Sequence, residues 1–499
     1  MHKAGFDTNK YLKEQTKKIL ERVSKFERLY LEFGGKLCYD LHAARVLPGY
    51  KSTTKIELLK KLGDIEIIYC ISSKDIEKGR VRRDFGLTYD NMALKDISDI
   101  RDFGLNVSSV IITRYSGEHS VKIFKKKLEN FGMKAYIHDE IEGYPNDIDK
   151  VLAGYEKQPY VKIDKKLIII TGVGGNSGKM AFCLSQIYHE RKKNQKTGFA
   201  KFETFPIWNL ELKHPINVAY EAATADLLDV NMVDPFHKKA YGITAVNYNR
   251  DVENFNILIS LMGKITGEKD PFGYKSPTDM GANMAKEGII DDKACREAAK
   301  QEIIRRYFRY YREKVEGIET QETLDRMEEI MKEVKVKPED RKVVKAARKV
   351  AEEAKKGKGF NNVFCGAAIE LNGKIITGKN SSLLHAESAA ILNAIKELAK
   401  IPDDIDLISK DVIKVITNMK KDLLNKKTSC LNVDETLIAL AMSSTTNPTA
   451  KKALSKLKKL ENCEMHITHL PTKGDEAGLI RLNMNVTTDA KLSLLPYFQ

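Results

Sequence analysis

The sequence lacks the features that would assign it to a membrane, secreted or zinc-knuckle class. No run of about 18 consecutive apolar residues occurs, which argues against a membrane-spanning helix. The first twenty residues, MHKAGFDTNKYLKEQTKKIL, contain no uninterrupted apolar segment of the kind that a secretory signal needs. The 7 cysteines stand far apart with no CxxC pair, so neither a disulfide framework nor a thiolate zinc knuckle is indicated. We therefore expect a cytoplasmic protein with reduced thiols and no membrane partner.

A formal net charge of +15 raises the question of nucleic-acid binding. The lysines of 331–359 alternate with Glu and Asp at helical spacing, which is typical of a solvated helix face. The chain has no nucleic-acid-binding signature, and its aromatic residues do not alternate with basic ones. We therefore expect an anionic or phosphorylated small molecule as the partner, and no nucleic acid. A homo-oligomer is compatible with the sequence.

The 499 residues, 42% of them hydrophobic, are enough for two or three domains with sizeable cores. In the first half, amphipathic helical stretches alternate with short apolar strands such as 29-LYLEFGG-35. This alternation predicts a doubly wound, mostly parallel α/β sheet. Helical spacing follows, and then a linker at 355–362 and a smaller C-terminal α/β part. We predict an α/β domain at 1–255, a mainly helical region at 256–355 and a second α/β domain at 356–499.

The stretch 167-LIIITGVGGNSGKMAFCLSQIYHE-190 predicts a strand, a glycine-rich loop and a helix. A phosphate loop needs glycines that let backbone N–H groups surround oxygen atoms, a helix N-terminus and a lysine. The loop departs from GxxxxGK, because one extra residue separates the glycines and Met180 stands where a hydroxyl would hold Mg²⁺. The alternative is a tight turn that binds nothing. We predict a site for ATP or another nucleotide with magnesium, formed by Gly172, Gly174, Gly175, Asn176, Ser177, Gly178 and Lys179.

A dense polar segment, 203–251, follows the next predicted strand. In a doubly wound sheet the carboxyl end of that strand lies beside the loop, at the edge where ligands bind. Glu203 and Asp234 are therefore candidate magnesium ligands or general bases. The candidate anion binders or acids are Lys213, His214 and His237. The alternative is a buried hydrogen-bond network that holds an irregular segment.

The C-terminal part begins with two predicted strands joined by an Asn-Gly turn at 372–373, followed by a helix that opens with 385-HAE-387. This order is similar to the first half of a cytidine-deaminase-type domain, in which the His would bind zinc and the Glu would shuttle protons. The second half differs, because the nearest counterpart of the PCxxC pair, 428-TSCLNVDE-435, offers only Cys430. We therefore predict a deaminase-like fold without bound zinc.

Several long motifs resemble a bacterial family catalogued as domain of unknown function eighteen-forty-six. They include the run from 201-KFETFPIWNLELKHP-215 to 247-NYNRDVENF-255, and 29-LYLEFGGKLCYDLHAARVLPGY-50 near the start of the chain. Shorter ones are 82-RRDFGLTYD-90, 275-KSPTDMG-281 and 301-QEIIRRYF-308. The resemblance covers essentially the whole chain. It implies an α/β N-terminal part and a smaller C-terminal part, and it carries over no catalytic residue.

We therefore expect an enzyme that binds a nucleotide or phosphorylated compound at 172–179, as a kinase or an ATP-dependent ligase would. A ligand-sensing or scaffold protein that keeps the pocket without turnover is the first alternative. A hydrolase or deaminase centred on His385 and Glu387 is the second, and it would need a metal ion.

Overall fold

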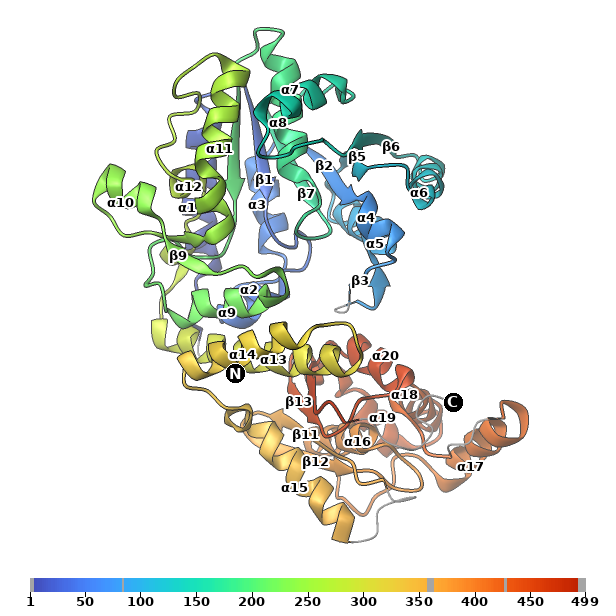
Figure 1. Cartoon of the computed structure of the whole chain (residues 1–499). Helices are drawn as coiled ribbons and strands as arrows, with labels where there is room; N and C mark the ends of the chain where they lie inside the picture. Colours follow the sequence, from blue (N-terminus) through green and yellow to red (C-terminus); the bar gives the residue numbers. More distant parts are fainter. Residues whose placement is uncertain (1–3, 83–84, 357–362, 426–428, 492–499) are drawn as a thin grey trace. The chain divides into compact units, whose positions relative to one another are not determined.

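The structure, a computed structural model, describes residues 4–82, 85–356, 363–425 and 429–491 (Figure 1). The chain divides into two compact units, His2–Glu302 and Ile303–Gln499. Most of the linker predicted at 355–362 lies outside the described residues. The predicted boundaries near residues 255 and 355 stay predictions. Within the described part of the chain, no helix is long and apolar enough to cross a membrane.

A six-stranded parallel sheet forms the centre of the first unit. The strands pair in the order β6-β5-β2-β7-β1-β8, and every pairing is parallel. They are β1 (Arg28–Phe33), β2 (Ile65–Ser72), β5 (Val107–Tyr115), β6 (Lys134–Asp139), β7 (Leu167–Gly172) and β8 (Thr197–Phe202). All six residues of β7 are buried, as a strand that is covered on both faces requires. The predicted α/β architecture with a parallel sheet is confirmed.

Helices pack against this sheet on its two faces (Figure 1). Helix α8 contacts β1, β7 and β8 and lies beside α7 and α11, whereas α1 contacts β1 and packs against α3. The helices of the central layers are α1 (Thr8–Val23), α3 (Thr54–Leu62), α4 (Ser73–Glu77), α5 (Tyr89–Asp102), α6 (His119–Asn130), α7 (Ile148–Lys157), α8 (Lys179–Arg191) and α11 (Asn249–Thr266). Asp7 shows how such a helix starts, because its carboxylate accepts hydrogen bonds from the first free N–H groups of α1.

The strand order determines which loops meet. From β2 the chain adds β5 and β6 on one side, and it then returns to place β7 between β2 and β1. The carboxyl ends of β7, β1 and β8 are therefore neighbours, and Phe33 of β1 pairs with Phe202 of β8 with ring centroids 4.2 Å apart. Ligands of doubly wound sheets bind at such a reversal of strand order. The loop that follows β7 lies at this edge.

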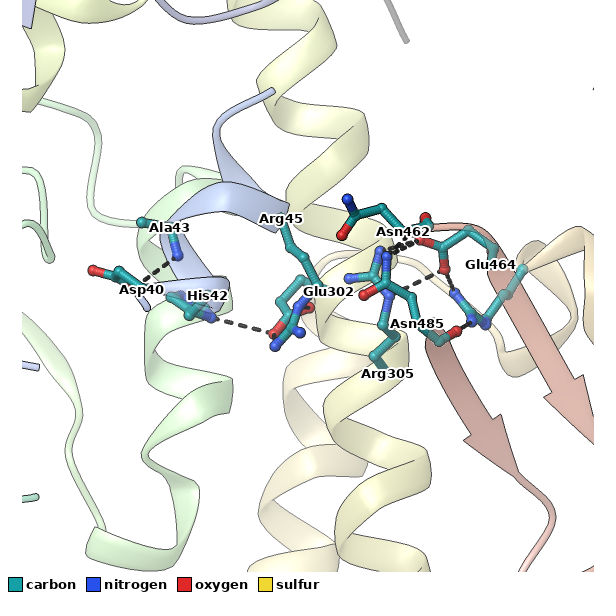
Figure 2. Close-up of polar contacts among 10 residues, drawn as sticks. Asp40, His42, Ala43, Arg45, Glu302, Arg305, Asn462, Glu464 and Asn485 are labelled. Atoms are coloured by element: carbon teal, nitrogen blue, oxygen red, sulfur yellow. Dashed lines mark hydrogen bonds and ion pairs between the residues drawn. The ribbon is translucent and has the colours of Figure 1, made fainter. Parts of the chain in front are cut away.

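Short elements make up the remainder of the first unit. The predicted polar segment folds into small helices and the two-stranded β9–β10 ribbon instead of one long loop. The short elements are α2 (Leu41–Val46), β3 (Val81–Arg82), β4 (Leu87–Thr88), α9 (Pro215–Ala223), β9 (Asn231–Val233), α10 (Pro235–Tyr241), β10 (Val246–Tyr248) and α12 (Pro277–Met280). Helix α13 (Asp292–Val315) begins in this unit, where its Glu302 accepts hydrogen bonds from Arg45 and contacts His42 (Figure 2).

The second unit contains a four-stranded sheet in the order β12-β11-β13-β14. The strands are β11 (Gly366–Leu371), β12 (Lys374–Lys379), β13 (Glu464–Ile467) and β14 (Asn485–Thr488). β11 is antiparallel to β12 and β13, and β14 is parallel to β13. Asn372 and Gly373 join β11 to β12 with φ values of 52° and 83°, which confirms the predicted hairpin with its Asn-Gly turn.

Helices surround this smaller sheet. They are α14 (Gln321–Glu333), α15 (Lys342–Lys356), α16 (Ala386–Ala399), α17 (Lys410–Asn418), α18 (Val433–Ser443), α19 (Pro448–Leu454) and α20 (Lys473–Arg481). Glu464 at the start of β13 accepts hydrogen bonds from Arg305 and Asn485 (Figure 2). The fully buried Arg341 also donates to Glu464, and these guanidinium groups hold the pKa of this carboxyl, which burial alone would raise, at about 2. A charged network thus replaces apolar packing at this end of the sheet.

Candidate functional site

The predicted phosphate loop connects β7 to α8 at the sheet edge (Figure 1). Lys179 is the first residue of α8, and its Nζ donates to the Gly174 carbonyl oxygen and the Ser177 Oγ, each at 3.3 Å. The same ammonium group lies 3.9 Å from Glu32 Oε1 on the neighbouring strand β1. The lysine is therefore folded over its own loop, and both side chains of the ion pair are mostly buried, with exposures of 10% and 14%.

Packing explains two of the glycines. Gly178 has a φ of 75°, and an added Cβ would lie 2.6 Å from the Thr113 Oγ1. At Gly172 an added Cβ would lie 2.4 Å from the carbonyl oxygen of Cys70. Thr113 also donates to the Ser177 carbonyl oxygen at 2.9 Å, which ties the loop to β5. These positions need glycine for the fold itself.

Gly174 and Gly175 are different. An added Cβ at Gly174 would be 3.4 Å from the Tyr89 Oη, and at Gly175 it would be 3.3 Å from the Leu227 Cδ1. Neither distance forces a rearrangement of the backbone, and neither glycine has a positive φ. The fold alone does not require glycine at these two positions.

Charged residues from β1, which lies beside β7, and from β8, which lies beside β1, gather near Lys179. Glu32 lies on β1, Lys201 lies near the end of β8, and Glu203 follows that strand. Lys201 Nζ lies 2.5 Å from Asp251 Oδ1 at the start of α11. The Glu32 Oε2 is buried and accepts no hydrogen bond from any described residue. We call Glu32, Lys179, Lys201, Glu203 and Asp251 the edge cluster.

Burial raises the pKa of Glu203 to about 8. That pKa already includes an upward contribution from the neighbouring carboxylates Asp251 and Glu32 and an opposing one from the ammonium groups of Lys201 and Lys179. Tyr248 donates a hydrogen bond to Glu203 Oε2. A carboxyl group with this pKa exchanges its proton near neutral pH, which is the property of a general acid or base.

A small cleft opens beside the edge cluster. Its lining includes Lys201, Glu203, Trp208, Asn247, Asp251 and Asn283. Arg250 lies near the loop from the other direction, because its Nη1 donates to the Asn176 side chain at 3.3 Å and its Nη2 to Asp229 at 2.8 Å. The loop therefore has basic groups from α8 and α11 next to it.

Asp234 has a structural position in α10. Its carboxylate is fully buried and accepts hydrogen bonds from the N–H groups of Phe236 and His237, both at 3.0 Å. It also accepts from the backbone N–H of Thr278 at 3.2 Å and from that residue's hydroxyl at 2.7 Å. Two oxygens that already accept four hydrogen bonds make Asp234 the cap of α10 and a tie to the first turn of α12.

The predicted histidines are also part of the local framework. His214 caps α9 by accepting the N–H of Ile216, and its Nε2 lies 2.9 Å from Asp292. His237 contacts the Ser276 hydroxyl at 2.9 Å. Lys213 is exposed. Of the five residues predicted to be catalytic, only Glu203 lies in the edge cluster.

The sequence prediction missed Glu32, Lys201 and Asp251 as parts of one site. A usable signal existed, because Glu32 and Lys201 are charged residues within strands whose neighbours are nearly all apolar. A charge in such a strand is costly unless it has a partner or a function.

A second polar cluster lies in the second unit. His385 Nδ1 lies 2.8 Å from Asp475 Oδ2, and one donor atom each of His385, Glu387 and Asp475 lie within 4.8 Å of one another. His469 Nε2 lies 3.6 Å from Glu387 Oε1. All four side chains are buried, with residue exposures between 0% and 6%. We call these four residues the HAE cluster.

Charge compensation dominates this cluster. Burial raises the pKa of Glu387, but the adjacent His469 outweighs burial and lowers it to about 2. Burial lowers the pKa of His385, but the hydrogen bond that its Nδ1 makes to the Asp475 carboxylate, together with the charge of that carboxylate, outweighs burial and raises the pKa. Cys430, the only thiol that the sequence offers near the expected PCxxC position, contacts the Ser381 carbonyl oxygen at 3.1 Å. Asp475 at the start of α20, which the sequence argument did not consider, is the residue that contacts His385.

Comparison with known proteins covers nearly the whole chain. Residues 4–335 match the family described as "Domain of unknown function DUF1846, N-terminal", and residues 339–495 match its C-terminal counterpart. A UPF0371 protein from Clostridium tetani is 49% identical over 491 residues, covering 98% of this chain and 97% of the relative. UPF0371 proteins from two Clostridium botulinum strains, of types E3 and A, are 48% and 49% identical and cover 97% or more of both chains. The chain therefore belongs to the DUF1846 family, a family of bacterial relatives whose function its own description leaves open.

Proposed function

We propose that the first unit binds a phosphorylated small molecule at the loop 172–179, with ATP or another nucleotide and magnesium as the first candidate. Gly174 and Gly175 support this assignment, because the fold does not require glycine there and a ligand that approaches the backbone would. Lys179 and Arg250 supply positive charge next to the loop. The N-terminus of α8, which begins at Lys179, adds the positive end of a helix dipole.

The observation that carries the proposal is the carboxylate of Glu32. Its Oε2 is buried and accepts no hydrogen bond from the described residues, although it lies on the strand next to the loop. Buried polar atoms in folded proteins nearly always have a partner. A magnesium ion or a ligand hydroxyl beside Lys179 would supply that partner.

Glu203 gives the proposed site its chemistry. With a pKa of about 8, it is mostly protonated at pH 7, and its ionised fraction, which grows as the pH approaches 8, can take a proton from an attacking group of the second substrate. Lys201, held by Asp251, would stabilise negative charge that develops in the transition state. This combination fits a kinase-like or an ATP-dependent ligase-like reaction, in which positioning and electrostatics do most of the work.

The loop differs from that of typical P-loop enzymes because Met180 follows the lysine. Under the proposal, Glu32 takes over the magnesium-binding role of the missing hydroxyl, with Ser177 as a second oxygen ligand. A ligand sensor or scaffold without turnover is the alternative, since binding alone does not need a well-held magnesium ion. Measurement of turnover separates the two.

The hydrolase or deaminase alternative belongs to the second unit. Zinc deaminases have a His-x-Glu motif on one helix and a P-C-x-x-C motif on another. In this chain His385 and Glu387 lie at the start of α16, and Pro471 to Asp475 reads P-T-K-G-D at the start of α20. The contact between His385 and Asp475 supports a deaminase-like arrangement in which Thr472 and Asp475 stand at the cysteine positions.

Calorimetric titration tests the first proposal. We expect the full-length protein to bind at least one of ATP, ADP, GTP or pyrophosphate, and to bind it more tightly with magnesium than with EDTA. Lys179→Ala should weaken binding at least about tenfold, because a charged hydrogen-bond donor to phosphate is removed. Lys192→Ala is the matched control, since Lys192 caps the other end of α8 and is 52% exposed. Equal affinities in the Lys179 variant and the parent would contradict the proposal.

Turnover is measured in the same samples. Release of phosphate or of ADP that requires magnesium and disappears in Glu203→Gln would favour the enzyme. Tight binding with no turnover for any candidate acceptor would favour the sensor.

A further inference from the structure

We infer that the HAE cluster, formed by His385, Glu387, His469 and Asp475, is a binding site for one divalent first-row transition metal ion, such as Zn²⁺. The inference concerns the second unit alone, and it holds whether or not the loop of the first unit binds a nucleotide. The sequence led us to expect no zinc, because His385 and Cys430 were the only visible ligands. The structure gathers a different set.

Geometry is the first argument. Donor atoms of His385, Glu387 and Asp475 lie within 4.8 Å of one another, and His469 Nε2 lies 3.6 Å from Glu387 Oε1. In a tetrahedral zinc site with bonds of about 2.0–2.1 Å, neighbouring ligand atoms are about 3.3 Å apart. Two contacts in the cluster, at 2.8 Å and 3.6 Å, lie on either side of that value, and an ion would have to draw the remaining donors closer together.

The second argument is independent of the spacing. Glu387 is 0% exposed, and neither of its carboxylate oxygens accepts a hydrogen bond from the described residues. A buried carboxylate that served only to hold the fold would be expected to accept hydrogen bonds at both oxygens. Glu387 Oε1 instead has only the longer ion-pair contact with His469 Nε2 at 3.6 Å, and one donor atom each of His385 and Asp475 lies within 4.8 Å of a Glu387 oxygen.

Charge and donor type indicate the class of ion. Two carboxylates and two imidazoles bind a divalent cation with no net charge left over, which matters in a site that water does not reach. Imidazole nitrogen together with carboxylate oxygen suits Zn²⁺, Fe²⁺, Mn²⁺ or Co²⁺ better than Mg²⁺ or Ca²⁺, which prefer oxygen ligands alone.

The surroundings of Asp475 already position the site. Thr472 Oγ1 donates to Asp475 Oδ2 at 2.6 Å, and the N–H of Val433 donates to Oδ1 at 2.8 Å. Ligating groups in metal proteins are commonly oriented by such outer hydrogen bonds. The same bonds connect the starts of α18 and α20, and His385 and Glu387 add the start of α16. The ion would thus hold three helix starts together, and the burial of the site indicates a structural role.

Cobalt titration of the full-length protein is the direct test. The protein is first dialysed against a chelator, and Co²⁺ or Zn²⁺ is then added. We expect uptake of about one ion per chain, a visible absorption band typical of four-coordinate Co²⁺, and a rise in melting temperature. The melting temperature must rise because an ion that binds the folded state, but not the unfolded state, stabilises the folded state.

Variants assign the site. Glu387→Gln and His385→Asn should each lower affinity for Co²⁺ by 100-fold or more, since loss of outer-shell partners alone costs about 10–100-fold. His466→Asn is the matched control, because His466 is an equally buried histidine of the same unit that contacts Asp489 at 3.4 Å. Its cobalt spectrum should stay unchanged. Lack of uptake by the chelator-treated parent protein, or uptake and spectrum unchanged in Glu387→Gln, would overturn the inference. The parent measurement decides even if a variant fails to fold.

Discussion

Replacement of Glu203 by glutamine should make the protein more stable at pH 8 than the parent, and should have little effect at pH 5. Burial holds the carboxyl group of Glu203 in its neutral form up to a pKa of about 8, compared with 4.5 for an ordinary glutamate. The folded state therefore binds this proton more tightly than the unfolded state does. The stability that this protonated carboxyl group contributes is fully present below pH 4.5. That contribution is lost as the pH rises from 4.5 to about 8.

Glutamine has the shape and charge of the protonated acid and does not ionise, so the unfolding free energy of the variant does not fall with pH for this reason. Each pH unit in the interval weakens the folded parent by up to about 1.4 kcal/mol. Over the whole interval the advantage of Glu203→Gln therefore reaches at most about 5 kcal/mol. The hydrogen bond from Tyr248 survives the substitution, because the glutamine oxygen still accepts it.

Urea unfolding followed by circular dichroism at pH 5, 6, 7 and 8 measures the difference. Other titrating groups contribute equally to both proteins and cancel when the free energies of unfolding are subtracted. Glu211→Gln is the control, because the side chain of Glu211 is 83% exposed, and its difference should stay near zero at every pH. A difference for Glu203→Gln that does not change with pH, or that falls as the pH rises, would refute the reasoning.

Three further results are expected. Gly178→Ala should lower the free energy of unfolding by at least about 1–2 kcal/mol in thermal unfolding, because the φ of Gly178 is positive and Thr113 leaves no room for a Cβ. Gly175→Ala, in contrast, should fold normally and bind ligand more weakly. Asp234→Asn should lower the free energy of unfolding by roughly 1–3 kcal/mol, because it weakens the hydrogen bonds that Thr278 donates to the carboxylate. Ligand affinity per folded molecule should stay unchanged, and a loss of affinity would show that Asp234 belongs to the ligand site. Glu464→Gln should destabilise the protein by ~3–5 kcal/mol at pH 7, with a smaller effect near pH 3, because it leaves the buried Arg341 without its anion.

The sequence was sufficient for the strands of the main sheet and for the hairpin of the second unit, but not for the short elements of the polar segment. Apolar runs such as LIIITG predicted buried parallel strands, and the Asn372-Gly373 pair predicted the hairpin of the second unit. These predictions succeed because burial on both faces and a left-handed turn impose strong local requirements on residue type.

The edge cluster depends on strand order, which no local pattern contains. Glu32 and Lys179 are distant in sequence, and they meet only because β7 lies beside β1. Asp234 and His214 were selected for their chemistry, but helix capping was the stronger local demand on them. Likewise, Cys430 precedes α18, whereas the partner of His385 comes from α20, which follows a strand in the same sheet as β11.

The place of β7 also constrains how the chain can fold during synthesis. β1 ends at Phe33, yet its two sheet neighbours begin only at Leu167 and Thr197. Strands β2, β5 and β6 can pair in the order in which they leave the ribosome, but β1 waits without a partner and the edge of β2 stays open. Unpaired strand edges invite association between chains, and long-range pairing is slow. A nascent chain that stops before Phe202 therefore exposes an incomplete sheet, and the soluble yield should depend on how promptly translation passes residues 140–202.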